Sequence, residues 1–150
     1  MSDIVFRTPR EALERLVSDL ESPGAGFWRL ADDRLELVEF VAGGSLPEET
    51  ATSFAAATRS VPLDRISLAI VRAAVELKSI VSYARDLDPE VGSGYWLRRL
   101  GAELSIAAPI LNLQGRPIGV VSIGVNGSNR NDEVVSELVR TLASRLVAFV

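Results

Sequence analysis

The residues best suited to ligand chemistry lie in the middle of the chain, on both sides of a polar segment at 86–94. Two tyrosines, a tryptophan and two arginines flank this segment: Tyr83, Arg85, Tyr95, Trp96 and Arg99. Aromatic rings stack on planar molecules, and guanidinium groups bind carboxylates and phosphates through paired hydrogen bonds. The cluster therefore predicts a site for a planar or anionic ligand. The structural alternative is that Trp96 fills core space under the loop while the arginines are solvated.

The chain lacks the side chains on which most enzymatic and metal chemistry depends. Its 150 residues include no cysteine and no histidine, so they offer neither a thiolate nucleophile nor an imidazole base or ligand. A segment starting at Asp86 begins like a calcium loop, but Val91 and Leu97 occupy the positions that need Gly and Glu. We expect a protein that is not an enzyme and holds no metal or cofactor. An enzyme built on a buried, pKa-shifted carboxylate or tyrosine is the remaining alternative.

Composition also limits the partners that the chain can have. There are 16 basic and 20 acidic residues, spread along the chain without a basic stripe, and this argues against nucleic-acid binding. No apolar run is long enough to cross a bilayer, and neither the amino terminus nor the cysteine count suggests export. We therefore expect one cytoplasmic domain over residues 1–150 that does not contact a membrane. Apolar residues make up 47% of the chain, enough to build a core.

Apolar periodicity and turn residues predict a mixed chain of helices and strands. Helices are expected near residues 9–21, 47–57, 64–78, 95–100 and 132–150. Strands are expected at 26–31, 34–41, 59–63, 79–83, 104–113 and 116–125. The first helix has the clearest beginning, because Thr8 can cap it and Pro9 suits its first turn.

The clearest hairpin joins the last two strands through a two-residue turn at Gln114-Gly115. In that register one face of the hairpin is apolar, and the other carries small side chains with Ser105 and Ser122 toward its far end. These hydroxyls could bind a ligand in the space that the small residues leave. Alternatively, the small residues admit a closely packed helix. A slip of one residue would exchange the two faces.

The order of elements, with a helix at each end and a sheet between them, resembles that of GAF domains. The similarity extends over almost the whole chain and is carried by Ser67–Val81, Leu104–Ile110, Gly115–Ile123 and the helix after Asn131. The resemblance implies an α/β fold of the α+β type, with a central antiparallel sheet. It also implies that the N- and C-terminal helices pack on one face, while shorter helices and loops cover a pocket on the other.

The resemblance implies several functions as well, and this sequence departs from most of them. Thioether-linked bilin and methionine-sulfoxide reduction need cysteine in that family, and histidine-ligated haem needs histidine; both residue types are absent. The Asn-Lys-Xaa-Phe signature of the cyclic-nucleotide members is also missing, because Asn129–Glu133 is only superficially similar to it. What remains is a ligand bound without metal or covalent bond, or no ligand.

The last predicted helix has more apolar residues than one packing face requires. Beside its main stripe it carries a second one, and such a surplus on a surface helix favours a partner, most simply a second copy of the chain. We expect a homodimer in which the contact residues are Val134, Leu138, Val139, Leu142, Leu146 and Phe149. The alternative is that both stripes pack internally.

Together these features predict a regulatory sensor domain. A small molecule bound under residues 83–100 would shift this cover, and the terminal helices would report the change. Because the sequence contains no effector domain, the output would go to a separate effector protein, unless the sequence is a fragment. The alternative function is a ligandless dimerisation or scaffold module with the same fold.

Overall fold

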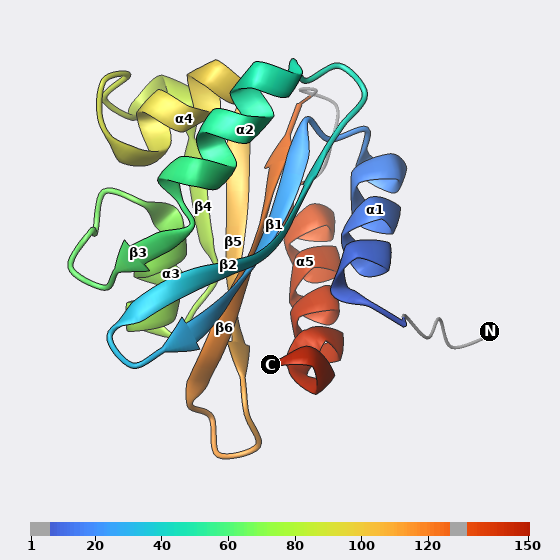
Figure 1. Ribbon diagram of the computed structural model, residues 1–150, viewed down its shortest axis with the longest axis vertical. Helices are drawn as coiled ribbons and strands as arrows, with labels where there is room; N and C mark the ends of the chain where they lie inside the picture. Colours follow the sequence, from blue (N-terminus) through green and yellow to red (C-terminus); the bar gives the residue numbers. More distant parts are fainter. Residues whose placement is uncertain (1–6, 127–131) are drawn as a thin grey trace.

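The computed structural model describes residues 7–126 and 132–150, which form a six-stranded sheet between two layers of helices (Figure 1). The helices are α1 (Pro9–Leu20), α2 (Glu48–Ala57), α3 (Ala69–Glu76), α4 (Gly92–Leu100) and α5 (Asp132–Leu146). The strands are β1 (Gly24–Ala31), β2 (Arg34–Ala42), β3 (Ser60–Pro62), β4 (Ile80–Tyr83), β5 (Leu104–Leu111) and β6 (Pro117–Val125). Short 3₁₀ turns follow β4 and α5 at Ala84–Asp86 and Val147–Phe149.

The sheet has the order β3-β2-β1-β6-β5-β4, and every neighbouring pair is antiparallel. The two terminal helices, α1 and α5, cover one face, and α2, α3 and α4 lie over the other (Figure 1). The fold predicted from the sequence is therefore confirmed. Among the described residues, no helix combines the length and the apolar character needed to span a bilayer.

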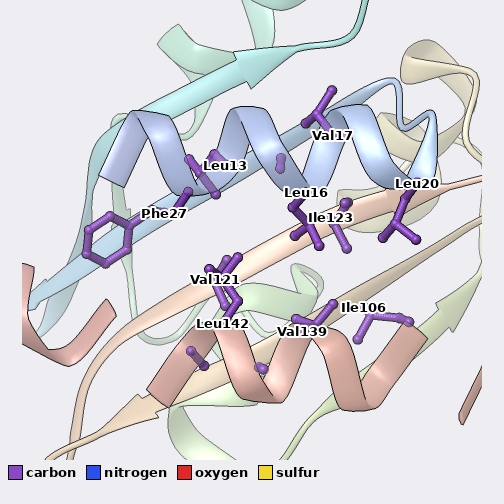
Figure 2. Packing of buried hydrophobic residues seen from close by; sticks show 14 of the residues in the cluster. Leu13, Leu16, Val17, Leu20, Phe27, Ile106, Val121, Ile123, Val139 and Leu142 are labelled. Atoms are coloured by element: carbon purple, nitrogen blue, oxygen red, sulfur yellow. The ribbon is translucent and has the colours of Figure 1, made fainter. Parts of the chain in front are cut away.

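The larger core lies between the sheet and the terminal helices. Figure 2 shows Leu13 and Leu16 of α1 on one side of this core and Val139 and Leu142 of α5 on the other, all packed over β6. Thr8 caps α1 as predicted, since its hydroxyl oxygen accepts a hydrogen bond from the backbone N–H of Glu11 at 3.1 Å. A second, smaller core forms where α3 packs on the opposite face.

The predicted register of the last hairpin is confirmed over most of its length. Leu104 pairs with Val125, and the same register continues to the pair of Ile110 with Gly119. The predicted two-residue turn is wrong, because a register shift follows Ile110 and the loop runs over residues 112–116. The side chain of Asn112 closes this longer loop by accepting hydrogen bonds from the N–H groups of Gln114 and Arg116.

A bulge interrupts the alternation of β2. Trp28 pairs with Leu37, but the preceding residue, Phe27, pairs with Glu39, so that Val38 is an extra residue in β2. Leu37 therefore belongs to the core under α3, whereas Val41 belongs to the core under the terminal helices. A strict period of two would have placed Leu37 and Val41 on the same face.

The third predicted helix begins five residues later than the sequence suggested. Residues 64–68 form turns, and α3 starts at Ala69, whose N–H donates to the hydroxyl oxygen of Ser93 at 2.8 Å. Ile66, which was expected on the buried face of this helix, therefore lies before it and is exposed. The apolar periodicity hid this boundary because the turn residues continue the helical pattern.

The surplus apolar residues of α5 divide between core and surface. Val139, Leu142 and Leu146 are buried against the sheet, and Phe149 packs against the same core. The three buried residues leave no continuous exposed stripe through them, and the dimer contact over all six residues stays a prediction. Val134 and Leu138 keep 57% and 45% of their surface exposed, and they remain the candidate contact residues.

Candidate functional site

A pocket lies between the sheet and the helices α2, α3 and α4. Its cavity has a volume of about 50 Å³. The floor consists of β1, β5 and β6, and the walls consist of apolar and aromatic side chains from the three helices and β2. The pocket therefore occupies the side of the sheet that the sequence predicted for it.

Small residues make the floor of this pocket. Ser105 of β5 lies opposite Gly124 of β6, and Ser122 of β6 lies opposite Gly26 of β1. The Ser22 hydroxyl, at the entry to β1, fixes the two outer strand ends by donating to the Gly124 carbonyl at 2.6 Å and accepting from the Gly24 N–H at 2.9 Å. The floor is therefore held by strand pairing and by Ser22, and its own side chains are small.

Two of these glycines give room to aromatic rings. A Cβ at Gly26 would lie 2.3 Å from the ring of Trp28, and one at Gly24 would lie 2.7 Å from the ring of Phe40. Both distances are shorter than any ordinary van der Waals contact, so any larger residue would displace the rings. The glycines are needed here for space, because neither has a positive φ angle.

Phe54 of α2 is the central aromatic residue of the pocket. Its ring lies 5.0 Å from Phe40, 5.2 Å from Trp96 of α4 and 6.3 Å from Trp28, with edge-to-face geometry toward both tryptophans. The Trp28 indole N–H donates to the carbonyl of Thr58 at 2.9 Å, which attaches the end of α2 to the sheet. We call Trp28, Phe40 and Trp96 the aromatic box, since they surround Phe54 on three sides.

The structure brings three of the predicted site residues into the pocket. Trp96, Ser105 and Ser122 all line it. Tyr95 and Arg99 lie beside it, on the outer side of α4, where the guanidinium group donates to the Tyr95 hydroxyl at 2.8 Å. Arg99 also stacks on the rings of Tyr95 and Trp96 at 5.6 and 5.4 Å. Arg99 therefore covers Trp96 from outside and does not line the cavity.

The other two predicted residues lie outside the pocket, Tyr83 beside the core under the terminal helices and Arg85 in the exposed 3₁₀ turn that follows β4. Tyr83 pairs with Leu104 and points toward α5, in a surface groove that also contains Val81 and Arg140. Arg85 stacks on Tyr83 at 4.8 Å. The prediction failed here because β4 has only four residues, too few for its alternation to show which face each one takes.

The electrostatic character of the pocket also differs from the expectation. Among the described residues, no Asp, Glu, Lys or Arg side chain lines the pocket. Its polar lining includes the hydroxyls of Ser105 and Ser122, and Ser105 is 8% exposed. The predicted arginine contacts to an anionic ligand are therefore not formed in this pocket. The described residues contain no group of three or more acidic side chains placed to hold a metal ion.

Sequence reasoning missed Phe40, Phe54 and the floor glycines. Gly24 and Gly26 did leave a signal, because glycine at alternating positions of a strand marks a close approach from one side. Phe40 gave no such signal, since the bulge in β2 changes the face on which it lies. Phe54 stands among small residues in a weakly amphipathic helix, where it looks like an ordinary core residue.

Comparisons with known proteins identify the fold. No family model matches the sequence, and no curated protein matches it. Among solved structures, the GAF domain of A. aeolicus nlh2 in an inactive state has a TM-score of 0.66 at 17% identity, over 99% of this chain and 86% of that one. The type II free methionine-R-sulfoxide reductase of Thermoplasma acidophilum also gives 0.66 at 17% identity, over 91% and 85%.

A third similar structure is the GAF domain of an Acinetobacter phosphoenolpyruvate-protein phosphotransferase. Its TM-score is 0.63 at 12% identity, and the match covers 91% of this chain and 75% of that one. All three identities are low, so they are evidence for the fold alone. The chain has the GAF fold, as its sequence predicted.

Proposed function

We propose that this GAF-fold chain is a regulatory sensor domain that binds a small molecule non-covalently in the pocket under α2 and α4. The observation that carries the proposal is the pocket itself, in which a floor of glycine and serine faces an aromatic cover. Ser105 and Ser122 on this floor border the cavity, where their hydroxyls are available to donate to or accept from a ligand.

The same strands connect the pocket to the terminal helices. In β1 and β6, Gly26 and Ser122 line the pocket, while their chain neighbours Phe27 and Val121 pack under α1 and α5. A ligand that shifts the pocket floor would therefore also shift the strand residues on which the terminal helices pack. We propose that these helices act on a separate effector protein in the cytoplasm, a location supported by the cysteine-free sequence.

Composition supports a binding function over the enzymatic one found among the similar structures. Reduction of a sulfoxide requires a two-electron donor, and among protein side chains the cysteine thiol fills that role. This chain has no cysteine. It also has no histidine, and no carboxylate from the described part of the chain lines the pocket to serve as a general acid or base.

The test is a thermal-shift screen of nucleotides, amino acids, organic acids and neutral metabolites. A ligand at a hundredfold excess over its Kd should stabilise the fold by about 2.7 kcal/mol. Ser122→Leu places a larger side chain in the pocket and should abolish the response, whereas Ser18→Leu, the same change at an exposed position of α1, should preserve it. If no compound stabilises the wild-type protein, the sensor proposal is wrong.

A second candidate function rests on the exposed apolar residues of α5. Val134 and Leu138 are one helical turn apart and are both more than two-fifths exposed. They could pair two copies of the chain through their terminal helices, with or without a ligand. The ligandless module differs from the sensor in one measurable respect, because its assembly would not respond to any compound that the screen identifies.

A further inference from the structure

We propose that the ligand of this pocket is an uncharged aromatic molecule of about one ring, which takes the place of the Phe54 ring in the aromatic box. This inference rests on the proposed sensor function and names the chemical class of its ligand. Four features support it: the neutral lining, the shape of the aromatic box, the small cavity volume and the weak anchoring of α2.

The neutral lining excludes a charged ligand. Transfer of an unpaired carboxylate or phosphate from water into an apolar site is strongly unfavourable, and such ligands need a cationic partner in the pocket. No charged side chain described in the structure lines this one. The nearest arginine of the predicted cluster, Arg99, is held outside by Tyr95 and by the outer face of Trp96.

The shape of the box fits a single ring. The box surrounds Phe54 with ring centroids 5.0 to 6.3 Å away, the spacing at which aromatic pairs interact favourably. A ligand ring in the same place would keep these contacts. Ser105 and Ser122 on the floor supply one polar anchor below it, suited to a hydroxyl or a ring N–H.

The cavity volume requires that something moves. A cavity that accepts benzene measures about 150 Å³, which is about three times the 50 Å³ present here. Trp28 cannot easily make room, because it is buried and hydrogen-bonded to Thr58. Phe54 can, since it is only partly buried and belongs to the cover of the pocket.

The helix that carries Phe54 is weakly anchored. α2 has no fully buried residue and no side-chain cap at its first turn. By contrast, α3 on the same face has five buried residues. A ligand ring would thus replace the Phe54 ring between the other aromatic side chains. This replacement would displace α2 with little loss of its other packing contacts. The movement of α2 is then the first event of the signal.

The experiment measures binding of three probes of similar size to the full chain: phenol, benzoate and cyclohexanol. Intrinsic tryptophan fluorescence reports the box directly, because Trp28 and Trp96 are the two tryptophans of the chain and both line the pocket. We expect phenol to bind. The affinity for benzoate should be lower by about tenfold at least, and cyclohexanol should also bind more weakly than phenol.

Variants then locate the site. Phe54→Ala removes the ring that the ligand must displace, so phenol should bind about tenfold more tightly. Phe54→Leu replaces it if the alanine variant does not fold. Removing a serine hydroxyl in Ser122→Ala should weaken phenol binding about three- to tenfold, and Ser18→Ala should have no effect.

The outcomes separate this inference from the proposed function. If benzoate or another charged compound binds and Ser122→Leu abolishes its binding, the neutral aromatic class is wrong while the sensor function stands. If phenol binds equally well to wild type, Phe54→Ala and Ser122→Leu, it binds elsewhere and the inference fails. If neither these probes nor any screened compound binds, both the inference and the sensor function are wrong.

Discussion

At the scale of single residues, the pocket depends on side chains that are small. Gly24 and Gly26 allow the rings of Phe40 and Trp28 to lie directly on the strand, and Ser105 and Ser122 keep the rest of the floor low. The glycines contribute space for the rings, and the serines contribute hydroxyls at the edge of the cavity.

The first prediction concerns the glycine beneath Trp28. Gly26→Ala would place a methyl group 2.3 Å from the buried Trp28 ring, so the ring must shift. We expect a loss of about 1–3 kcal/mol in the free energy of unfolding, measured by chemical denaturation. Gly44→Ala is the matched control, because no atom lies within 4 Å of the added Cβ, and its effect should stay below about 1 kcal/mol. Equal stability of the two variants would contradict this account.

Some of these residues could be found from the sequence. Ser105 and Ser122 were identified because their hairpin is long and its register well determined, so their shared face follows from alternation. Tyr83 could not be placed because β4 has only four residues, too few to show which face each one takes. Proximity along the chain to Tyr95 and Trp96 suggested a common site, but Tyr83 packs beside the core under the terminal helices and Arg85 stacks on it.

At the scale of elements, α2 and α3 cover the same face of the sheet, but α3 buries far more of its residues than α2 does. Five residues of α3 are fully buried, while none of α2 is. The Arg72 side chain also hydrogen-bonds Glu76 at 3.0 Å within α3, and this bond lowers the pKa of that carboxyl. α2 is held mainly through Phe54 and through Thr58 at its end.

The second prediction follows from this contrast. Backbone amides of α2 should exchange their hydrogens through local opening of the helix. Their protection factors, measured by hydrogen exchange with mass spectrometry or NMR, should be lower than those of α3 by about tenfold at least. The amides of α3 are the internal control, because both helices lie on the same face of the sheet. Similar protection in the two helices would show that α2 is anchored as firmly as α3 and would weaken its role as a moving cover.

The elements themselves were largely predictable, and the errors have local causes. The sequence placed the helices and strands in the right order, and it placed the last hairpin in the right register up to Ile110. The beginning of α3 was missed because the residue that receives its first N–H is Ser93, from a distant part of the chain. The bulge in β2 was missed because Val38 looks like a regular strand residue.

At the scale of the whole molecule, one sheet separates two compartments. The terminal helices close a fully packed core on one side, and the shorter helices leave a small cavity on the other. The strands β1 and β6 belong to both compartments.

The third prediction concerns assembly through the terminal helices. If Val134 and Leu138 pair two copies, the double variant Val134→Lys with Leu138→Lys should be a folded monomer by light scattering at concentrations where the wild type is a dimer. The folded state should survive, because both side chains are largely exposed. Leu113→Lys is the control, since Leu113 is fully exposed on the β5–β6 loop. A wild-type monomer at tens of micromolar would exclude the dimer.

The extra residue in β2 has a consequence for how the chain can change its length. If Val38 were deleted, Leu37 would still pair with Trp28 and Glu39 with Phe27, and every other side chain would keep its face. Deletion of Glu36 instead, with the bulge closed, would pair Leu37 with Arg29 and so move Leu37 out of the core under α3. Related chains one residue shorter in this strand should therefore have their gap at the bulge.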